Sequence, residues 1–286
     1  MNIVNILEEI EKVDGDVYER LSPRRKAMKD FFGMGSKITL AAMPMALGSM
    51  FQKAYGQTVP TGVVNVLQYA LTLEHFEYNF YLRGYNEAPI PANDKPAIQI
   101  IRDSEGKHVE FLKTVISSLG TTPVAAKSSY DFSAGTGTTA GAGNGPFKDV
   151  FTNYVTFLAV AQVLEDTGVR AYKGRAGELL GQKVYLTAAL GIHAVEARHA
   201  AKIRYMRRLN GHAPNLKVYI TGANDSGVPA ADGNYAGENN VVQGGLTVTT
   251  FPGVSGNISV NAASEAFDEP LTATQVLALV APFGVS

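Results

Sequence analysis

Glutamate and histidine stand three residues apart at two places in the chain, Glu105 with His108 and Glu196 with His199. On a helix, residues three apart share a face, so each pair would present a carboxylate beside an imidazole. The other positions on these two faces are apolar: Ile101, Leu112 and Val115 around the first pair, and Ile192, Ile203 and Met206 around the second. A carboxylate in an apolar stripe is costly unless it is paired, protonated or bound to a cation. The spacing therefore indicates metal binding.

The two pairs belong to a longer repeat with a constant shift of 91 residues. Glu74 and Glu165 are related by this shift, and each lies 31 residues before the Glu of its Glu-x-x-His pair. The surrounding positions follow the same shift, so that Leu67, Leu71, Tyr78 and Tyr81 correspond to Leu158, Gln162, Val169 and Tyr172. The sequence thus predicts two similar helical hairpins, each carrying one Glu and then Glu-x-x-His.

Together the repeat supplies six candidate metal ligands: Glu74, Glu105, His108, Glu165, Glu196 and His199. The same helix faces carry no Lys or Arg. Four carboxylates balance the charge of two divalent ions, and neutral imidazoles complete the ligand set. Carboxylate with imidazole suits iron or manganese, and the ligand types do not choose between them. We expect two divalent metal ions, Fe or Mn.

Three further residues are candidates for supporting this site. Tyr81 and Tyr172 each lie seven residues after a candidate ligand, where a buried phenol hydrogen-bonds across the core or takes part in redox chemistry. His193, three residues before Glu196, could orient a ligand or simply pack in the core. Glu77, one turn after Glu74, is a possible additional carboxylate, although a solvated position is expected for it.

Composition removes several other function classes. The 286 residues include no cysteine, which excludes disulfides, iron–sulfur clusters, Cys-ligated zinc and thiolate nucleophiles. Basic and acidic residues number 25 and 26, so the charge does not favour nucleic-acid binding. Metal ions and small oxidants are the expected partners, and we expect the chain to form a homo-oligomer.

Four stretches with helical periodicity would position these residues: 60–86, 94–119, 147–173 and 178–210. The Gly-, Thr- and Ser-rich connection 121–145 exceeds the roughly 12 extended residues needed to cross a helix of this length. After the fourth helix, 216–221 and 245–250 have strand-like composition, and 272–280 predicts a closing helix. We therefore predict a four-helix bundle over 58–212 and a loop-rich excursion with short hairpins and a closing helix over 213–286.

Residues 1–57 form a separate N-terminal segment. Residues 1–20 have the pattern of an amphipathic helix, and Arg24-Arg25 before the apolar run Ile38–Phe51 resembles a twin-arginine export signal. The run is shorter than the roughly 20 residues of a membrane span. Two interpretations stay open: a retained helical extension of a cytoplasmic protein, or a signal that directs the chain to the periplasm.

The ligand pattern resembles the ferritin-like di-iron and di-manganese carboxylate proteins, four-helix bundles that take one Glu from each of two helices and Glu-x-x-His from each of the others. The wording Leu71-Thr-Leu-Glu-His75, Ala194-Val-Glu-Ala-Arg-His-Ala-Ala201 and Phe267-Asp-Glu-Pro-Leu-Thr272 is similar to a bacterial ferritin-like domain family related to plant desiccation-related proteins. The resemblance covers 58–212 and the closing helix, and it implies a mainly all-α fold with a long crossover between the second and third helices.

For function, the resemblance implies oxidase or peroxidase chemistry with O₂ or peroxide, including ferroxidase or catalase-like activity. The alternative is a self-assembling structural or stress-protection protein, a homo-oligomer whose metal site is structural or vacant. Iron storage would need a closed shell. The Gly-rich excursion and the irregular crossover argue against a cage of the ferritin type.

Overall fold

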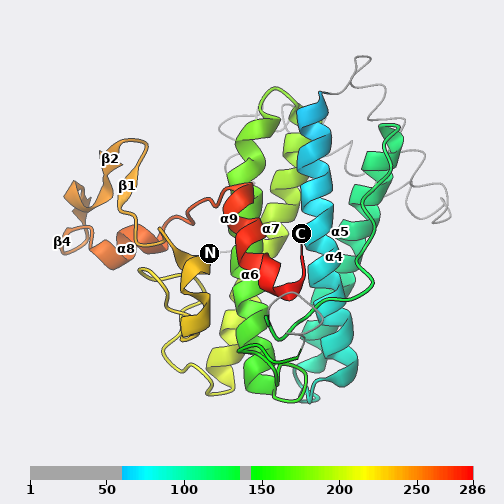
Figure 1. Ribbon diagram of the computed structural model, residues 1–286. Helices are drawn as coiled ribbons and strands as arrows, with labels where there is room; N and C mark the ends of the chain where they lie inside the picture. The colour runs from blue at the N-terminus through cyan, green and yellow to red at the C-terminus, as the bar shows by residue number, and fades with distance from the viewer. Residues whose placement is uncertain (1–59, 136–142, 286) are drawn as a thin grey trace, which may run out of the picture. The chain divides into compact units, whose positions relative to one another are not determined.

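Four long helices form the bundle in the computed structural model, which describes residues 60–135 and 143–285. They are α4 (Thr61–Glu87), α5 (Lys95–Ser118), α6 (Tyr154–Ala176) and α7 (Lys183–Leu209). Helix α4 packs mainly against α5 and α6 mainly against α7, each pair as an antiparallel hairpin (Figure 1). The predicted fold class, a mainly all-α four-helix bundle, is confirmed. The predicted N-terminal helix and the export-signal-like segment over 1–57 lie outside the described residues.

The third helix begins later than its apolar pattern indicates. It was predicted from residue 147, but α6 begins at Tyr154, where the Asn153 side chain accepts a hydrogen bond from the Val155 amide at 3.0 Å. The apolar residues before it, Phe147, Val150 and Phe151, are buried from turns rather than from a helix. The apolar pattern thus correctly predicts that these residues are buried, but it wrongly predicts a helical backbone for them.

The crossover from α5 to α6 runs along the length of α4 (Figure 1). Gln68 of α4 donates to the Thr122 carbonyl and accepts from the Val124 amide, both at 2.8 Å. Farther along, the Phe132 ring stacks on Phe76 with centroids 5.5 Å apart. The described part of the predicted irregular connection, 121–135 and 143–145, is indeed without helix or strand. Side-chain amides and aromatic rings therefore fix a segment that has no regular structure.

Residues after α7 are attached to the bundle by buried arginines. Arg204 of α7 is fully buried and pairs with Asp166 of α6 at 2.7 Å and with Asp225 at 3.0 Å. Its guanidinium also donates to the carbonyl oxygens of Lys217 and Tyr219. The strand predicted over 216–221 is not formed, because these carbonyls bond to a buried arginine instead of a neighbouring strand. A 3-10 helix, η2 (Pro229–Tyr235), follows.

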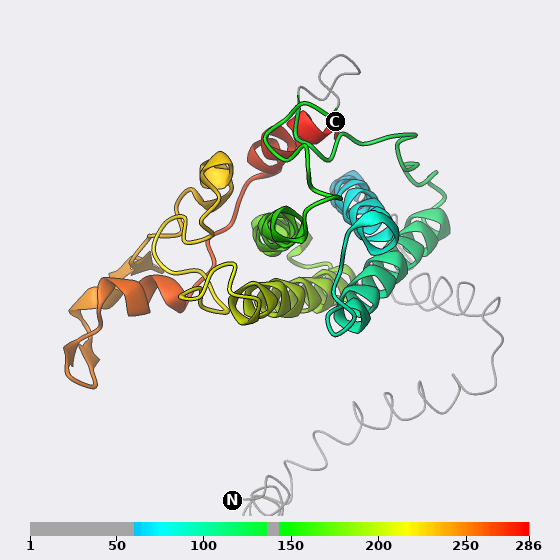
Figure 2. The same ribbon diagram turned by 90° about the horizontal axis from the view of Figure 1, so that it is seen from below.

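The short hairpins lie beyond η2 and project away from the bundle (Figure 2). Strand β1 (Val242–Gln243) pairs with β2 (Leu246–Thr247), and β3 (Pro252–Gly253) pairs with β4 (Gly256–Asn257), both antiparallel. The predicted strand-like stretch 245–250 is therefore only partly a strand, since 248–250 form the 3-10 helix η3 (Val248–Thr250). A short helix, α8 (Val260–Glu265), completes this part.

The chain returns to the bundle at its end. The closing helix α9 (Ala273–Val280) begins with a capping box, in which the Thr272 side chain accepts from the Gln275 amide and the Gln275 side chain accepts from the Thr272 amide. Helix α9 packs on α6, and the 3-10 helix η4 (Ala281–Phe283) brings Phe283 against Phe76. Searched over the described residues, no helix has the length and apolar character of a membrane span.

Candidate metal centre

All six predicted ligand side chains meet in the middle of the bundle. Helix α4 supplies Glu74, α5 supplies Glu105 and His108, α6 supplies Glu165, and α7 supplies Glu196 and His199. The four glutamates are at most 1 % exposed and the two histidines at most 8 %. Each lies on the inward stripe of its helix, so the helical periodicity of the sequence is what carries it into the core.

The six side chains form two overlapping groups that share Glu105 and Glu196. One group is Glu74, Glu105, His108 and Glu196, and the other is Glu105, Glu165, Glu196 and His199; in each, four potential ligand atoms lie within 4.8 Å of one another. The shared carboxylates divide their oxygens between the groups. Glu105 directs Oε2 to His108 Nδ1 at 3.0 Å and Oε1 to His199 Nδ1 at 2.7 Å.

Glu196 repeats this division of its oxygens. Its Oε1 lies 3.2 Å from His108 Nδ1, and its Oε2 lies 3.9 Å from His199 Nδ1. The unshared carboxylates each approach one histidine: Glu74 Oε2 lies 3.1 Å from His108, and Glu165 Oε2 lies 3.5 Å from His199. Each of the two groups could hold a metal ion, and Glu105 and Glu196 belong to both groups.

A tyrosine from the opposite half of the repeat holds each unshared carboxylate. The Tyr81 hydroxyl on α4 donates to Glu165 Oε1 at 2.5 Å, and the Tyr172 hydroxyl on α6 donates to Glu74 Oε1. In both cases the second carboxylate oxygen faces the histidine of the cluster. These bonds fix the orientation of the two carboxylates and leave one oxygen of each directed to the shared space.

Burial and mutual repulsion dominate the protonation of the cluster. Burial raises the pKa of Glu74 to about 7, and it raises that of Glu165 and, further, that of Glu196. Burial would also raise the pKa of Glu105, but the hydrogen bond to His108 and the positive charges of the adjacent His108 and His199 outweigh it and lower the value to about 2.

The histidines respond in the opposite sense. Burial by itself lowers the pKa of a histidine, but the surrounding carboxylates outweigh it, raising His199 to about 11 and His108 well above its ordinary range. In the metal-free protein, protons bound to the two histidines therefore supply the positive charge that offsets the surrounding carboxylates.

Several buried atoms of the cluster lack an aligned hydrogen bond. They are Glu105 Oε1, Glu165 Oε2, both carboxylate oxygens of Glu196 and His199 Nδ1. These atoms approach one another without the alignment of a hydrogen bond. Buried polar atoms without partners cost roughly 1–3 kcal/mol each. A cation placed among them would satisfy oxygen and imidazole ligands together, so the donor set fits divalent metal ions.

The other site candidates are placed differently. His193 lies half-buried with Nδ1 3.0 Å from the Val169 carbonyl and belongs to neither group of potential ligands. Glu77, expected in solvent, is instead 6 % exposed. A Cβ added at Gly168 would lie 3.2 Å from Glu77 Oε1 and 3.6 Å from Glu196 Oε2, which places the Glu77 carboxyl beside the cluster.

Glu77 is a possible additional carboxylate by its spacing, and the 91-residue repeat also carries a signal for its burial. Glu77 lies three residues after Glu74, on nearly the same face of α4, and its counterpart 91 residues later is Gly168. The missing side chain at Gly168 leaves the space that the Glu77 carboxyl occupies. Burial together with repulsion from Glu196 raises the pKa of Glu77 well above its ordinary value.

A buried cluster of four carboxylates and two histidines, drawn from four antiparallel helices, defines the class of ferritin-like four-helix proteins. The family model for the ferritin-like domain matches residues 62–208, more than half of the chain, and the protein belongs to this family. The resemblance noted from the sequence is thereby confirmed. No curated protein and no solved structure matches the chain.

Proposed function

We propose that Glu74, Glu105, His108, Glu165, Glu196 and His199 bind two divalent metal ions, iron or manganese. We further propose that the protein is an oxidoreductase of the oxidase or peroxidase type that uses O₂ or peroxide, with ferroxidase or catalase-like turnover as the candidate reactions. The observation that carries the proposal is the division of carboxylate oxygens by Glu105 and Glu196 between two histidine-containing groups.

Charge supports two ions rather than one. Four ionised carboxylates carry a charge of −4, which two divalent ions balance, whereas a single ion would leave two buried negative charges for protons to neutralise. Every ion pair that these carboxylates make within the described residues is with His108 or His199. The bundle thus provides no Lys or Arg counter-charge for the cluster.

Iron or manganese bound here would supply two-electron redox chemistry toward O₂ or peroxide. The protein's own residues orient the candidate ligands and keep bulk water away from them. Tyr81 and Tyr172 hold the unshared carboxylates, and each keeps a phenolic proton at the Oε1 atom it contacts. Burial of the whole cluster excludes bulk water from it.

Metal analysis of the purified protein tests this proposal. We expect about two equivalents of Fe or Mn per chain, turnover of peroxide or O₂, and loss of both in Glu105→Ala and Glu196→Ala. Glu110→Ala is the matched control, because Glu110 is an exposed glutamate on α5 that pairs with Lys107 and lies outside both groups of potential ligands. Retention of metal by both cluster variants, or absence of uptake by the wild type given Fe(II) or Mn(II), would refute the proposal.

A second candidate function has a structural observation in its favour. The hairpins and α8 expose large apolar side chains, namely Val242, Leu246, Phe251, Val254 and Val260. Exposed apolar clusters of this kind mark association surfaces. The protein would then self-associate as a structural or protective homo-oligomer, with the metal site structural. Light scattering of the full chain tests this second function. A monodisperse monomer at all protein concentrations measured would refute self-association.

A further inference from the structure

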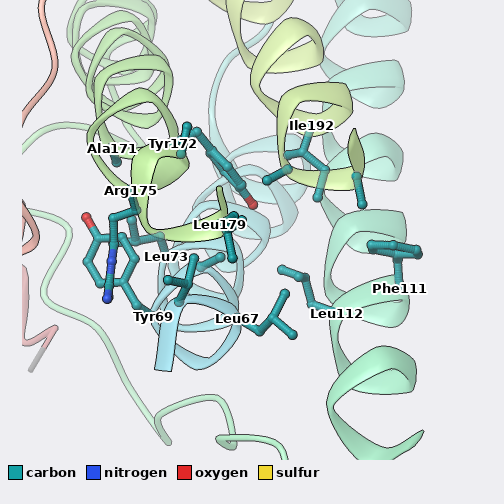
Figure 3. A pocket seen from close by; sticks show the side chains of 15 residues that line it. Leu67, Tyr69, Leu73, Phe111, Leu112, Ala171, Tyr172, Arg175, Leu179 and Ile192 are labelled. Atoms are coloured by element: carbon teal, nitrogen blue, oxygen red, sulfur yellow. The ribbon is translucent and has the colours of Figure 1, made fainter. Parts of the chain in front are cut away.

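A pocket lies between the four bundle helices, next to Tyr172 and toward the end of the bundle where α4 begins. Figure 3 shows side chains from all four helices around this space, among them Leu67, Leu112, Ala171 and Ile192. The 3-10 helix η1 (Gly177–Leu179) contributes Leu179. The space measures about 480 Å³, including the part that is open to solvent.

The 91-residue repeat shows why the pocket exists. The residue that corresponds to Ala171 in the first half is Phe80, and the residue that corresponds to Val66 in the second half is Phe157. At the opposite end of the bundle these two rings stack with centroids 5.1 Å apart and an interplanar angle of 10°. The Phe157 ring rests on the backbone of α4 at Gly84, where a Cβ would lie 2.2 Å from it. The pocket therefore occupies the place that two phenyl rings fill at the other end.

One side chain, Tyr172, separates the pocket from the candidate metal centre. The ring of Tyr172 forms part of its wall, and the hydroxyl of the same side chain donates to Glu74. At the filled end the equivalent Tyr81 is fully buried, whereas Tyr172 is partly exposed. At one end of the bundle aromatic rings thus fill the space beside the tyrosine, and at the other end that space is the pocket.

We propose that this pocket binds the apolar part of a small organic ligand, a small alkyl or aryl group, beside the cluster. The inference deepens the proposed function, on which it rests for the identity of the neighbouring metal centre. Benzene and xenon bind to cavities lined by Leu, Ile and Phe, and the side chains that line this pocket are of the same apolar kind.

The charges at the pocket support an apolar occupant. Arg175 is its charged lining residue, and Arg175 is already engaged: its guanidinium pairs with Glu178 at 2.6 Å and lies 4.9 Å from the centre of the Tyr69 ring. The remaining lining side chains are aliphatic or aromatic. A ligand that relied on a charged group inside the pocket would therefore lose hydration without gaining a partner.

Benzene binding to the full-length, metal-loaded protein, measured by titration calorimetry, and xenon in pressurised crystals test the proposal. Val66→Phe and Ala171→Phe each place a ring in the pocket, as the repeat does at its other end. Phe157→Val is the reciprocal variant and should open the filled end. Circular dichroism and metal content establish that each variant is folded and loaded.

We expect saturable benzene binding and a xenon site beside Tyr172 in the wild type, at least tenfold weaker benzene binding in both filling variants, and a second xenon site beside Tyr81 in Phe157→Val. Absence of saturable binding in the wild type would overturn the proposal, as would unchanged affinity in both filling variants. Metal content and peroxide turnover are measured separately from benzene binding. If the protein binds benzene but takes up no metal, the proposed function is refuted and the proposal of a ligand pocket is retained.

Discussion

The Tyr81 hydroxyl donates a hydrogen bond to Glu165 across the interface of the two helical hairpins, 84 residues away in the chain. Tyr172 and Glu74 make the reciprocal bond. Each half of the repeat thus orients a candidate ligand of the other half, so the cluster is completed only when the hairpins are docked.

Removing one of these hydroxyls should weaken metal binding more than folding. We expect Tyr81→Phe and Tyr172→Phe each to lower metal affinity by about 10- to 100-fold, the usual effect of losing a hydrogen bond to a ligand. The free energy of unfolding of the metal-free protein should fall by only about 1–2 kcal/mol. Competition with a chelator of known affinity measures the first quantity and urea denaturation the second. Equal metal affinity in both variants and the wild type would contradict the assigned role.

Glu77 should oppose folding while it supports metal binding. In the folded protein its pKa is raised, so at pH 7 the unfolded chain releases a proton that the folded chain must keep. Glu77→Gln removes that cost, and we expect the metal-free variant to be more stable than the wild type by a margin that grows as pH rises above about 4.3, the ordinary Glu value. Metal affinity should fall, because one carboxylate beside the cluster is lost. Glu110→Gln, exposed on α5, should change neither property.

The metal-free protein should lose stability as pH rises. Glu74 has its pKa raised to about 7, so its contribution is complete below the unfolded value near 4.3 and is lost as pH rises to 7. His199 has its pKa raised to about 11, so its contribution is complete below about 6.5 and declines through the alkaline range. Thermal unfolding at pH 5.5 and 8.5 should therefore show the lower Tm at pH 8.5.

Metal ions should remove this dependence. Ions that displace protons from the cluster bind more tightly at higher pH, so the stabilisation by added metal should increase between pH 5.5 and 8.5. Calorimetric titration in buffers of different ionisation enthalpy measures the protons released on binding. For the metal-free protein, a Tm that rises between pH 5.5 and 8.5 would contradict the prediction that raised pKa values of Glu74 and His199 govern its stability.

Arg204 should be the main anchor of the excursion that follows α7. Arg204→Ala leaves the buried Asp166 and the half-buried Asp225 without their cation, and removing one partner of a buried pair costs about 3–5 kcal/mol. Arg208→Ala, exposed one turn farther along α7, should stay within about 0.5 kcal/mol of the wild type. Urea denaturation compares the two variants. Similar losses in both would place the attachment elsewhere.

The sequence by itself determined the helices and the candidate cluster, because both depend on local spacing. A Glu and a His three residues apart share a helix face wherever that helix packs, and the 91-residue shift relates Glu105 to Glu196 without any knowledge of the fold. The same reasoning located the irregular crossover and the closing helix. It failed at Phe147 and at 216–221, where apolar or strand-like composition is satisfied by turns and by Arg204.

Only the tertiary structure decided what lies against each face. Periodicity shows that a helix face is apolar, but the residue that covers it comes from another part of the chain. For this reason the pairing of Tyr81 with Glu165, the burial of Glu77 beside Gly168 and the pocket at Ala171 could not be read from one helix at a time. The two halves of the repeat carry the same candidate ligands, but different residues pack around them. Phe80 and Phe157 fill the space at one end of the bundle, and at the other end their counterparts Ala171 and Val66 leave a pocket.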